Sequence, residues 1–280
     1  YVYVRTEYHL AVERMKNAIK KAEEIGVLGK NLFGSDFSFT LHVMEGAGAF
    51  VCGEETALIA SVEGKRGMPN PKPPFPAQHG LYGKPTVINN VETLSTVPLV
   101  IRDGADYYKK IGVPTSTGTK TFAITGYVKN TGLIEVPFGT TLREILFDIA
   151  GGVTDDKGNV SEDAFKAVQI GGPSGACLTR EHLDLPLDFD SLRKAGAMVG
   201  SGGLVVMNQT TCMVNTAKFF MQFTQSESCG KCVLCREGTK QMLMMLEDIT
   251  EGRADENTIP LLEQLANAVR VGSLCALGKT

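Results

Sequence analysis

Three closely spaced cysteines are the clearest chemical signal in this sequence of 280 residues. Cys229, Cys232 and Cys235 follow a C-x2-C-x2-C pattern. Three thiolates at this spacing are typical of one corner of a [4Fe-4S] cluster, which requires a fourth thiolate from elsewhere. Cys275 is the best candidate for that ligand, because it follows two predicted helices that could fold it back and because Gly272 nearby permits close approach.

Zinc is the alternative metal, and three reduced thiols without a metal are the third possibility. Structural zinc sites usually combine two separate C-x2-C knuckles, whereas the two knuckles here share Cys232. Lys231 and Arg236, together with a predicted helix start at Cys235, favour an anionic cluster. The remaining cysteines lack ligand spacing: Cys52, Cys177 and Cys212. We expect these three to be small, buried apolar side chains.

A glycine-rich turn and two adjacent carboxylates form a second candidate site. Gly46-Ala47-Gly48 follows a predicted strand, but Val51 occupies the last position of a GxGxxG pattern, so the dinucleotide fingerprint is weak. Gly53 is followed by Glu54 and Glu55 at a predicted helix start. These carboxylates could cap backbone N–H groups, or they could accept hydrogen bonds from a bound cofactor.

A proline-rich stretch follows this helix and contains basic residues but no acidic ones, from Gly64 to Lys84. Phe75, flanked by prolines, could offer a stacking face to a planar ligand or could lie in the core. Asn89 and Asn90 precede a predicted helix, and they could cap it or bind a ligand at its N-terminus. No histidine lies near a nucleophile, so we assign no catalytic residue and expect a cofactor to carry any reaction.

The composition is that of a folded protein, with 43% hydrophobic and 21% charged residues and a net charge of -3. It gives no support for nucleic-acid binding or membrane insertion. Apolar spacing predicts helices over residues 7–25, after Glu55 to about 62, and over 90–101, 214–223, 237–251 and 258–269. Alternation predicts strands over residues 1–5, 37–44, 120–128, 132–136 and 165–170. Thr141 and Glu144 predict a capping box at the start of a further helix.

Four runs of sequence resemble one known family. They are GAGAFVCGEETAL from Gly46, GKRGMPNPKPPFPAQHGLYGKPTVINNVETLSTVP from Gly64, ESCGKCVLCREGT from Glu227 and SLCALG from Ser273. Together they resemble the NADH-binding flavoprotein subunit of respiratory complex I. They are equally similar to the diaphorase subunits of NAD-dependent hydrogenases and formate dehydrogenases.

The resemblance implies an α/β and α+β multidomain protein. It implies a Rossmann-like FMN- and NADH-binding domain over residues 1–111, a β-grasp domain of the SLBB type over 112–207, and a helical [4Fe-4S] domain over 208–280. The family's upstream G-R-G-G-A-G-F type run is absent. We therefore expect the first domain to lack its N-terminal part and the last to continue beyond residue 280.

The resemblance also implies roles for particular residues. Gly53 and Glu54 would line FMN, Glu55 would lie near the nicotinamide nucleotide, and Phe75 would stack on the dinucleotide. The ribityl–phosphate end of FMN would be held by Asn89, Asn90 and Thr93. Phe50 stands where family members often have Tyr, so a hydroxyl contact is lost there. The cluster ligands would be Cys229, Cys232, Cys235 and Cys275.

The implied activity is hydride transfer between NADH and FMN, followed by single-electron transfer through the cluster to partner iron–sulfur subunits. The run from Gly171 to Gly175 looks more like the hydrogenase and formate dehydrogenase branch, which favours a soluble complex, with electron bifurcation as one option. The alternatives are a complex I flavoprotein subunit, an iron–sulfur docking module without catalysis and a zinc-stabilised interaction domain. A cytoplasmic location, or the cytoplasmic face of a membrane-associated complex, is expected.

Overall fold

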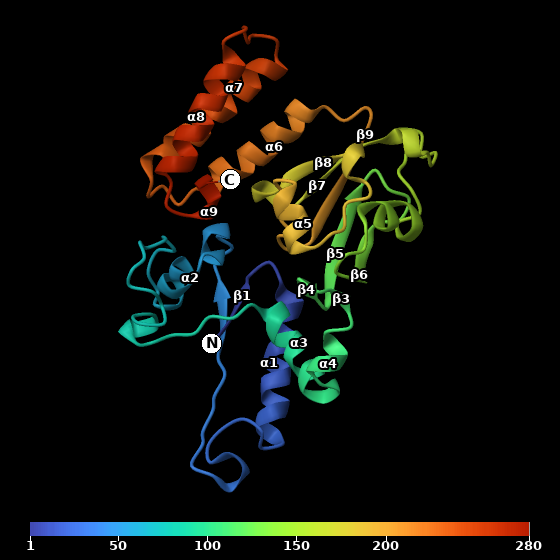
Figure 1. Ribbon diagram of the computed structural model, residues 1–280. Coiled ribbons are helices and arrows are strands. Elements are labelled where there is room, and N and C mark those ends of the chain that lie inside the picture. Colours follow the sequence, from blue (N-terminus) through green and yellow to red (C-terminus); the bar gives the residue numbers. More distant parts are fainter. Residues whose placement is uncertain (280) are drawn as a thin grey trace. The chain divides into compact units, whose positions relative to one another are not determined.

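Distant parts of the sequence come together in the computed structural model, which describes residues 1–279 (Figure 1). The chain divides into two units, and each is described by itself. The first unit combines residues 1–88, 227–236 and 272–275. The second contains residues 89–226 and 237–271 and the chain from residue 276.

The first unit begins with two parallel strands joined through a helix. Strand β1 (Val2–Arg5) pairs with β2 (Val43–Gly46), and α1 (His9–Glu24) lies between them in sequence. Helix α2 (Glu55–Val62) follows the second strand. Short 3-10 turns complete this unit: η1 (Leu32–Gly34), η2 (Phe50–Gly53) and η3 (Leu81–Gly83). The predictions of the first strand and of both helices are confirmed.

The predicted strand over residues 37–44 is wrong for most of its length. Only Val43 and Met44 belong to a strand, β2, and Phe39 makes one isolated bridge with Gly29. The alternating phenylalanines instead contact each other, with the rings of Phe37 and Phe39 stacked 6.3 Å apart, and both side chains are exposed. The alternation therefore reflects a local aromatic pair and not the buried face of a strand.

A small apolar core lies beneath the glycine-rich turn. Val51 and Cys52 of η2 pack with Ala57 of α2, and Tyr3 and Cys229 pack against them. Cys229 thus connects the cysteine run to this core across a long stretch of chain.

A five-stranded sheet forms the centre of the second unit, in the order β6-β5-β9-β7-β8. The central pair β5 and β9 is parallel, and the other neighbours are antiparallel. The strands are β5 (Thr119–Gly126), β6 (Gly132–Pro137), β7 (Phe165–Ile170), β8 (Ala176–Thr179) and β9 (Gly203–Asn208). A separate antiparallel pair precedes them: β3 (Gly112–Val113) and β4 (Ser116–Thr117).

The sheet is covered by a short π-helix, η4 (Glu144–Ile149), and by α5 (Phe189–Lys194). Ile145 and Leu146 are fully buried in the same core as Phe122 of β5. The predicted capping box is confirmed, since the Thr141 N–H donates to Glu144 Oε2 at 2.7 Å and the Glu144 N–H donates to Thr141 Oγ1 at 3.2 Å. Further turns in this unit are η5 (Glu162–Ala164), η6 (Gly172–Ser174) and η7 (Arg180–His182).

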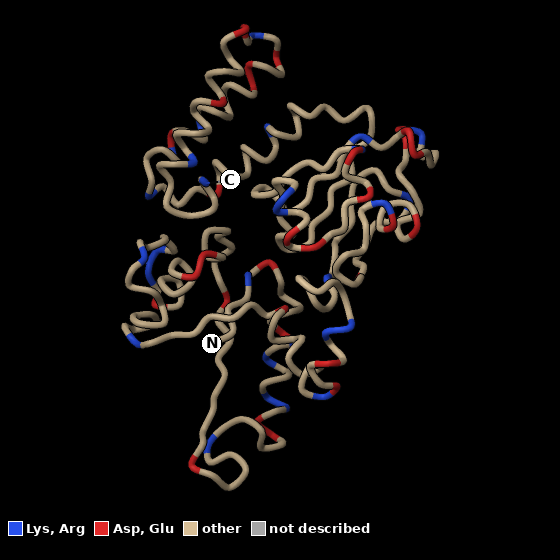
Figure 2. The backbone as a smooth tube through the Cα atoms, in the orientation of Figure 1, with Lys and Arg blue, Asp and Glu red and all other residues tan. Residues whose placement is uncertain are grey.

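Helices make up the rest of the second unit. They are α3 (Val91–Asp103), α4 (Ala105–Tyr108), α6 (Met213–Ser226), α7 (Thr239–Thr250), α8 (Thr258–Gly272) and α9 (Ala276–Lys279). A short π-helix, η8 (Leu234–Gly238), precedes α7 and begins within the segment of the first unit. The four helices predicted in this part of the sequence are confirmed. Figure 2 shows acidic and basic residues interspersed along the chain. Within residues 1–279, no helix is long and apolar enough to cross a membrane.

Candidate functional site

The four candidate cluster cysteines belong to the first unit. Cys229, Cys232 and Cys235 lie on the segment 227–236, and Cys275 ends the segment 272–275. Gly272 lies against the Leu234 side chain, since a Cβ at this glycine would overlap Leu234 Cδ1. The structure therefore places the segment that contains Cys275 against the cysteine run, while the assignment of Cys275 as the fourth ligand stays a prediction.

The chemistry of this donor set fits a cluster. The cysteines carry reduced thiols, with Cys235 buried and the other three half-buried. The Ser228 hydroxyl lies 3.5 Å from Cys235 Sγ, a contact of the kind that tunes sulfur ligands. Among residues 1–279, no three His, Cys, Asp or Glu side chains are grouped as ligands of one metal ion. The thiolates of an iron–sulfur cube bind different iron atoms and are not grouped around one centre.

Polar contacts dock the cysteine run onto the rest of the first unit. The Phe50 N–H of the glycine-rich turn donates to Glu227 Oε2 at 3.0 Å. The Lys231 ammonium donates to the Pro69 carbonyl and to Asn70 Oδ1, the latter at 3.3 Å. Phe50 lies in the glycine-rich turn, and Pro69 and Asn70 lie in the proline-rich loop. The cysteine run therefore contacts both segments of the second candidate site.

The adjacent carboxylates have different tasks. Glu54 is the N-cap of α2, and its Oε2 accepts the N–H groups of Thr56 at 2.9 Å and Ala57 at 3.0 Å. Its other oxygen lies 3.2 Å from Lys72 Nζ, and Lys72 also pairs with Glu55. The capping interpretation of Glu54 is therefore confirmed, while Glu55, at 38% side-chain exposure, is the more accessible carboxylate.

The charges of this group stabilise one another. Burial raises the pKa of Glu54, but hydrogen bonds from Thr56 and Ala57 and the Lys72 ammonium outweigh it, so the pKa lies below its ordinary value. The hydrogen bond to Glu55 is the main reason why the pKa of Lys72 is raised. Glu54 and Lys72 therefore stay ionised at neutral pH, and the Lys72 ammonium bridges the two adjacent glutamates.

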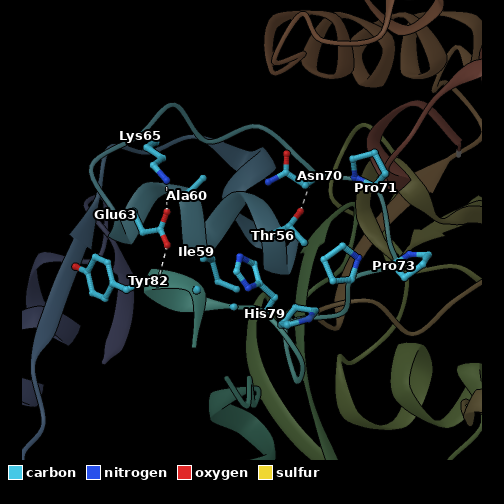
Figure 3. Close-up of a pocket in the computed structure, with 14 residues that line it drawn as sticks. Thr56, Ile59, Ala60, Glu63, Lys65, Asn70, Pro71, Pro73, His79 and Tyr82 are labelled. Atoms are coloured by element: carbon cyan, nitrogen blue, oxygen red, sulfur yellow. Dashed lines mark hydrogen bonds and ion pairs between the residues drawn. The ribbon is translucent and has the colours of Figure 1, made fainter. Parts of the chain in front are cut away.

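The proline-rich loop combines an aromatic ring with a pocket. Phe75 is 53% exposed, so its ring is accessible for stacking and is not a core side chain. A pocket of about 690 Å³ lies between α2 and this loop, lined by Thr56, Pro73, His79 and Tyr82 among others (Figure 3). Within the described chain, Phe75 is outside this lining.

Asn89, Asn90 and Thr93 belong to the second unit and are exposed. Asn90 caps α3, because its Oδ1 accepts the Glu92 N–H at 2.7 Å. The Glu92 carboxylate also binds Lys120 Nζ through both oxygens at 2.7 Å, and this lysine side chain is only 6% exposed. A buried cation of the sheet thus anchors the first turn of α3.

The remaining cysteines were predicted to be buried, and this is correct only for Cys52. Cys177 and Cys212 are exposed. Cys177 lies on the edge strand β8, where its thiol donates to Gln169 Oε1 at 2.9 Å, and Cys212 directly precedes α6. Both positions lie at the edge of an element, where a side chain can face solvent.

Sequence reasoning did not identify Thr56, Asn70 and Lys72 as site residues. A usable signal was present for Lys72, since a loop with basic residues and no acid follows two adjacent carboxylates. The roles of Thr56 and Asn70 depend on a hydrogen bond between them, from the Asn70 N–H to Thr56 Oγ1 at 2.8 Å, which has no sequence pattern.

Two family models match this chain. Residues 1–99 match the Nuo51 FMN-binding domain, and residues 215–280 match the NADH-ubiquinone oxidoreductase-F iron-sulfur binding region. The first match includes the carboxylate pair and the proline-rich loop, and the second includes all four candidate cluster cysteines.

Relatives are similar along almost the whole chain. NADP-reducing hydrogenase subunit HndC of Solidesulfovibrio fructosivorans is 52% identical over 279 residues, which are 100% of this chain and 56% of that protein. The F 2 subunit of NADH-quinone oxidoreductase of Rhizobium meliloti (strain 1021) is 44% identical over 278 residues, which are 99% of this chain and 65% of that protein. The chain thus spans less than two thirds of the length of these relatives.

The fold is also similar to a solved structure. The crystal structure of NAD+-reducing [NiFe]-hydrogenase in the H2-reduced state aligns with a TM-score of 0.86 and 34% identity, over 99% of this chain and 44% of that chain. The mixed helix and sheet architecture with its five-stranded sheet is therefore shared with this hydrogenase chain.

Proposed function

From the family of this chain, NADH-oxidising flavoprotein subunits with an FMN-binding domain and an iron–sulfur binding region, we propose the following function. The chain transfers a hydride between NADH and FMN and passes single electrons through a [4Fe-4S] cluster to other subunits of an oxidoreductase. Bound FMN supplies the exchange between two-electron and one-electron chemistry, and the protein supplies binding, orientation and electrostatics.

One observation carries this proposal. The cysteine run and the glycine-rich turn belong to separate family regions, yet they join in one unit through the Glu227 and Phe50 contact at 3.0 Å and through the packing of Cys229 on the Val51 core. A protein that moves electrons from a hydride acceptor to a cluster requires these two sites to be built together.

The residues of the chain have distinct tasks in this function. Gly53 and Glu54 line the flavin, and Glu54 also fixes the start of α2 as its cap. Glu55 accepts hydrogen bonds from the nucleotide near the nicotinamide, and the exposed ring of Phe75 stacks on the dinucleotide. Phe50 is a flavin neighbour that lacks a hydroxyl.

Two further groups complete the set. The ribityl–phosphate end of FMN is bound by polar side chains at the start of α3: Asn89, Asn90 and Thr93. The cluster is held by four thiolates: Cys229, Cys232, Cys235 and Cys275. Cys235 is buried and the other three are half-buried, which limits access of water to the sulfur atoms.

The domain assignment is part of the proposal. Residues 1–111 form the Rossmann-like FMN- and NADH-binding domain, residues 112–207 form a β-grasp domain of the SLBB type, and residues 208–280 form the helical cluster domain. The sheet order β6-β5-β9-β7-β8 with a parallel central pair supports the β-grasp assignment.

The chain is a subunit of a soluble hydrogenase or formate dehydrogenase of the cytoplasm, and its partners are other iron–sulfur subunits. The higher identity to the hydrogenase subunit, 52% against 44% for the quinone oxidoreductase subunit, supports this choice. A flavoprotein subunit of complex I is the second candidate, favoured by the several relatives with that name at 44% identity.

The test uses the full-length protein isolated anaerobically with its co-purifying subunits. We expect NADH to bleach a flavin absorbance band and to produce the EPR signal of a reduced [4Fe-4S] cluster. If the protein contains iron but NADH does not bleach the flavin band, the chain is an iron–sulfur docking module without catalysis. Absence of iron would contradict the proposal as a whole.

A further inference from the structure

The peptide group between Pro69 and Asn70 is bound at both ends. Its carbonyl oxygen accepts a hydrogen bond from the Lys231 ammonium, which lies between two cluster cysteines. Its N–H donates to Thr56 Oγ1 at 2.8 Å, as the dashed line between Asn70 and Thr56 in Figure 3 marks. Asn70 Oδ1 adds a second contact to the ammonium at 3.3 Å.

The chain of hydrogen bonds continues to the carboxylate pair. The Thr56 hydroxyl donates to Glu54 Oε2 at 2.5 Å. Every donor therefore points in the same direction, from the Lys231 ammonium through the peptide group and the hydroxyl to a carboxylate. Hydrogen bonds arranged in this way polarise one another, and here a cation and an anion stand at the two ends.

The cysteine run has a second fixed point close to this lysine. Glu227 binds the Phe50 N–H at 3.0 Å, and Cys229 packs against the apolar core between the two anchors. With both anchors in place, the backbone that carries the first two thiols has little freedom to shift. Without Lys231, the tie to the Pro69–Asn70 peptide would be lost, while the Glu227 contact, the Cys229 packing and the hydrogen bond from Arg236 to the Gly230 carbonyl would remain.

We propose that Lys231 is a positioning residue that fixes the cysteine run through the Pro69–Asn70 peptide and Thr56 to Glu54. Glu54 and the cysteine run then move together. The identity of the thiols as cluster ligands rests on the proposed function, whereas the connection itself rests on the contacts above. This role differs from a purely electrostatic effect of the lysine on the cluster, because it requires Thr56 as well.

The test measures native-state hydrogen exchange in the full-length holoprotein. We expect Lys231→Met to speed exchange of the amides of residues 229–233 about tenfold, the loss corresponding to one charge-assisted hydrogen bond. We expect Thr56→Val to have a similar effect on the same amides, although Thr56 lies far away in the sequence. Lys240→Met, which removes an exposed lysine from α7, is the control and should change exchange less than about twofold.

Several results would overturn the inference. If Thr56→Val speeds exchange only at the start of α2, Thr56 is a local capping residue and no connection exists. If the double variant shows the product of the two single effects, the residues act independently, whereas a shared chain predicts an effect close to that of either single variant.

A spectroscopic measurement gives a second readout. The EPR line shape of the reduced cluster should broaden in both single variants and stay unchanged in Lys240→Met. Failure of the proposed function is read separately, from iron content and flavin bleaching in the wild-type protein. Normal values there, combined with unchanged exchange in both variants, would refute this inference alone.

Discussion

The ion pair between Glu92 and Lys120 should be asymmetric in its effect on stability. We expect Glu92→Gln to destabilise the second unit by about 2 to 3 kcal/mol and Lys120→Met by less than about 1 kcal/mol. The reason is that the two partners are buried to different degrees, with 6% of the lysine side chain and 52% of the glutamate side chain exposed.

The magnitude follows from the two opposing electrostatic contributions. At an effective dielectric constant of about 20, a close pair of unit charges attracts by roughly 4 kcal/mol, and half exposure of the glutamate reduces this value. Removing the carboxylate charge loses that attraction and leaves an ammonium in a site where it is poorly solvated. Removing the ammonium instead leaves a carboxylate that water already reaches, and Met places its apolar chain in a pocket of about 430 Å³ that Phe138 also lines.

The assay is native-state hydrogen exchange of the β5 amides, which reports local opening of the sheet beside α3. Asp106→Asn removes an exposed acid from the first turn of α4 and is the matched control, with an expected change below about 0.5 kcal/mol. The double variant Glu92→Gln/Lys120→Met should be close to Lys120→Met alone. An equal or larger cost for Lys120→Met would refute the argument that burial of the ammonium determines the asymmetry.

Three further outcomes are expected. Cys232→Ser should abolish the EPR signal of the reduced cluster while NADH still bleaches the flavin, and an unchanged signal would remove this ligand assignment. Phe75→Ala should raise the KM for NADH more than it lowers kcat, because stacking contributes mainly uniform binding; Phe37→Ala, which removes another exposed ring, is the control in steady-state kinetics. Because its folded-state pKa is lowered, Glu54 contributes stability that is fully present above its unfolded pKa of about 4.3 and is lost as the pH falls through the folded value. Chemical denaturation at a series of pH values should therefore show the gap between wild type and Glu54→Gln closing in acid, and a constant gap would contradict the shift.

Local sequence patterns were sufficient to predict most of the helices. The helices had apolar spacing or caps within a few residues, such as the box of Thr141 and Glu144, and these signals do not depend on distant contacts. The strand over residues 37–44 failed because alternation alone does not specify a partner strand. Phe37 and Phe39 satisfied the pattern by contacting each other.

The candidate site was predictable in its residue types but not in its connections. The spacing of Cys229, Cys232 and Cys235 predicts a metal site directly. The basic loop signals a cation near the two carboxylates, but no spacing singles out Lys72 or Asn70 within it. Only the fold shows that Lys72 bridges Glu54 and Glu55, so the missing information was three-dimensional and not chemical.

The contacts that join the cysteine run to the first unit are individually too weak to hold it there. Glu227 and Phe50 are 177 positions apart, and closing a flexible loop of that length costs roughly 4 to 5 kcal/mol. One hydrogen bond to a charged group offsets only about 1.5 to 3 kcal/mol of this cost. Packing of Cys229 against Val51 and Cys52 must therefore contribute further stabilisation. Prior folding of the intervening chain into its own unit must also reduce the entropy cost, because it shortens the effective loop. The apolar contact of Cys229 therefore contributes the additional binding free energy, while the hydrogen bonds of Glu227 and Lys231 fix the position of the thiols.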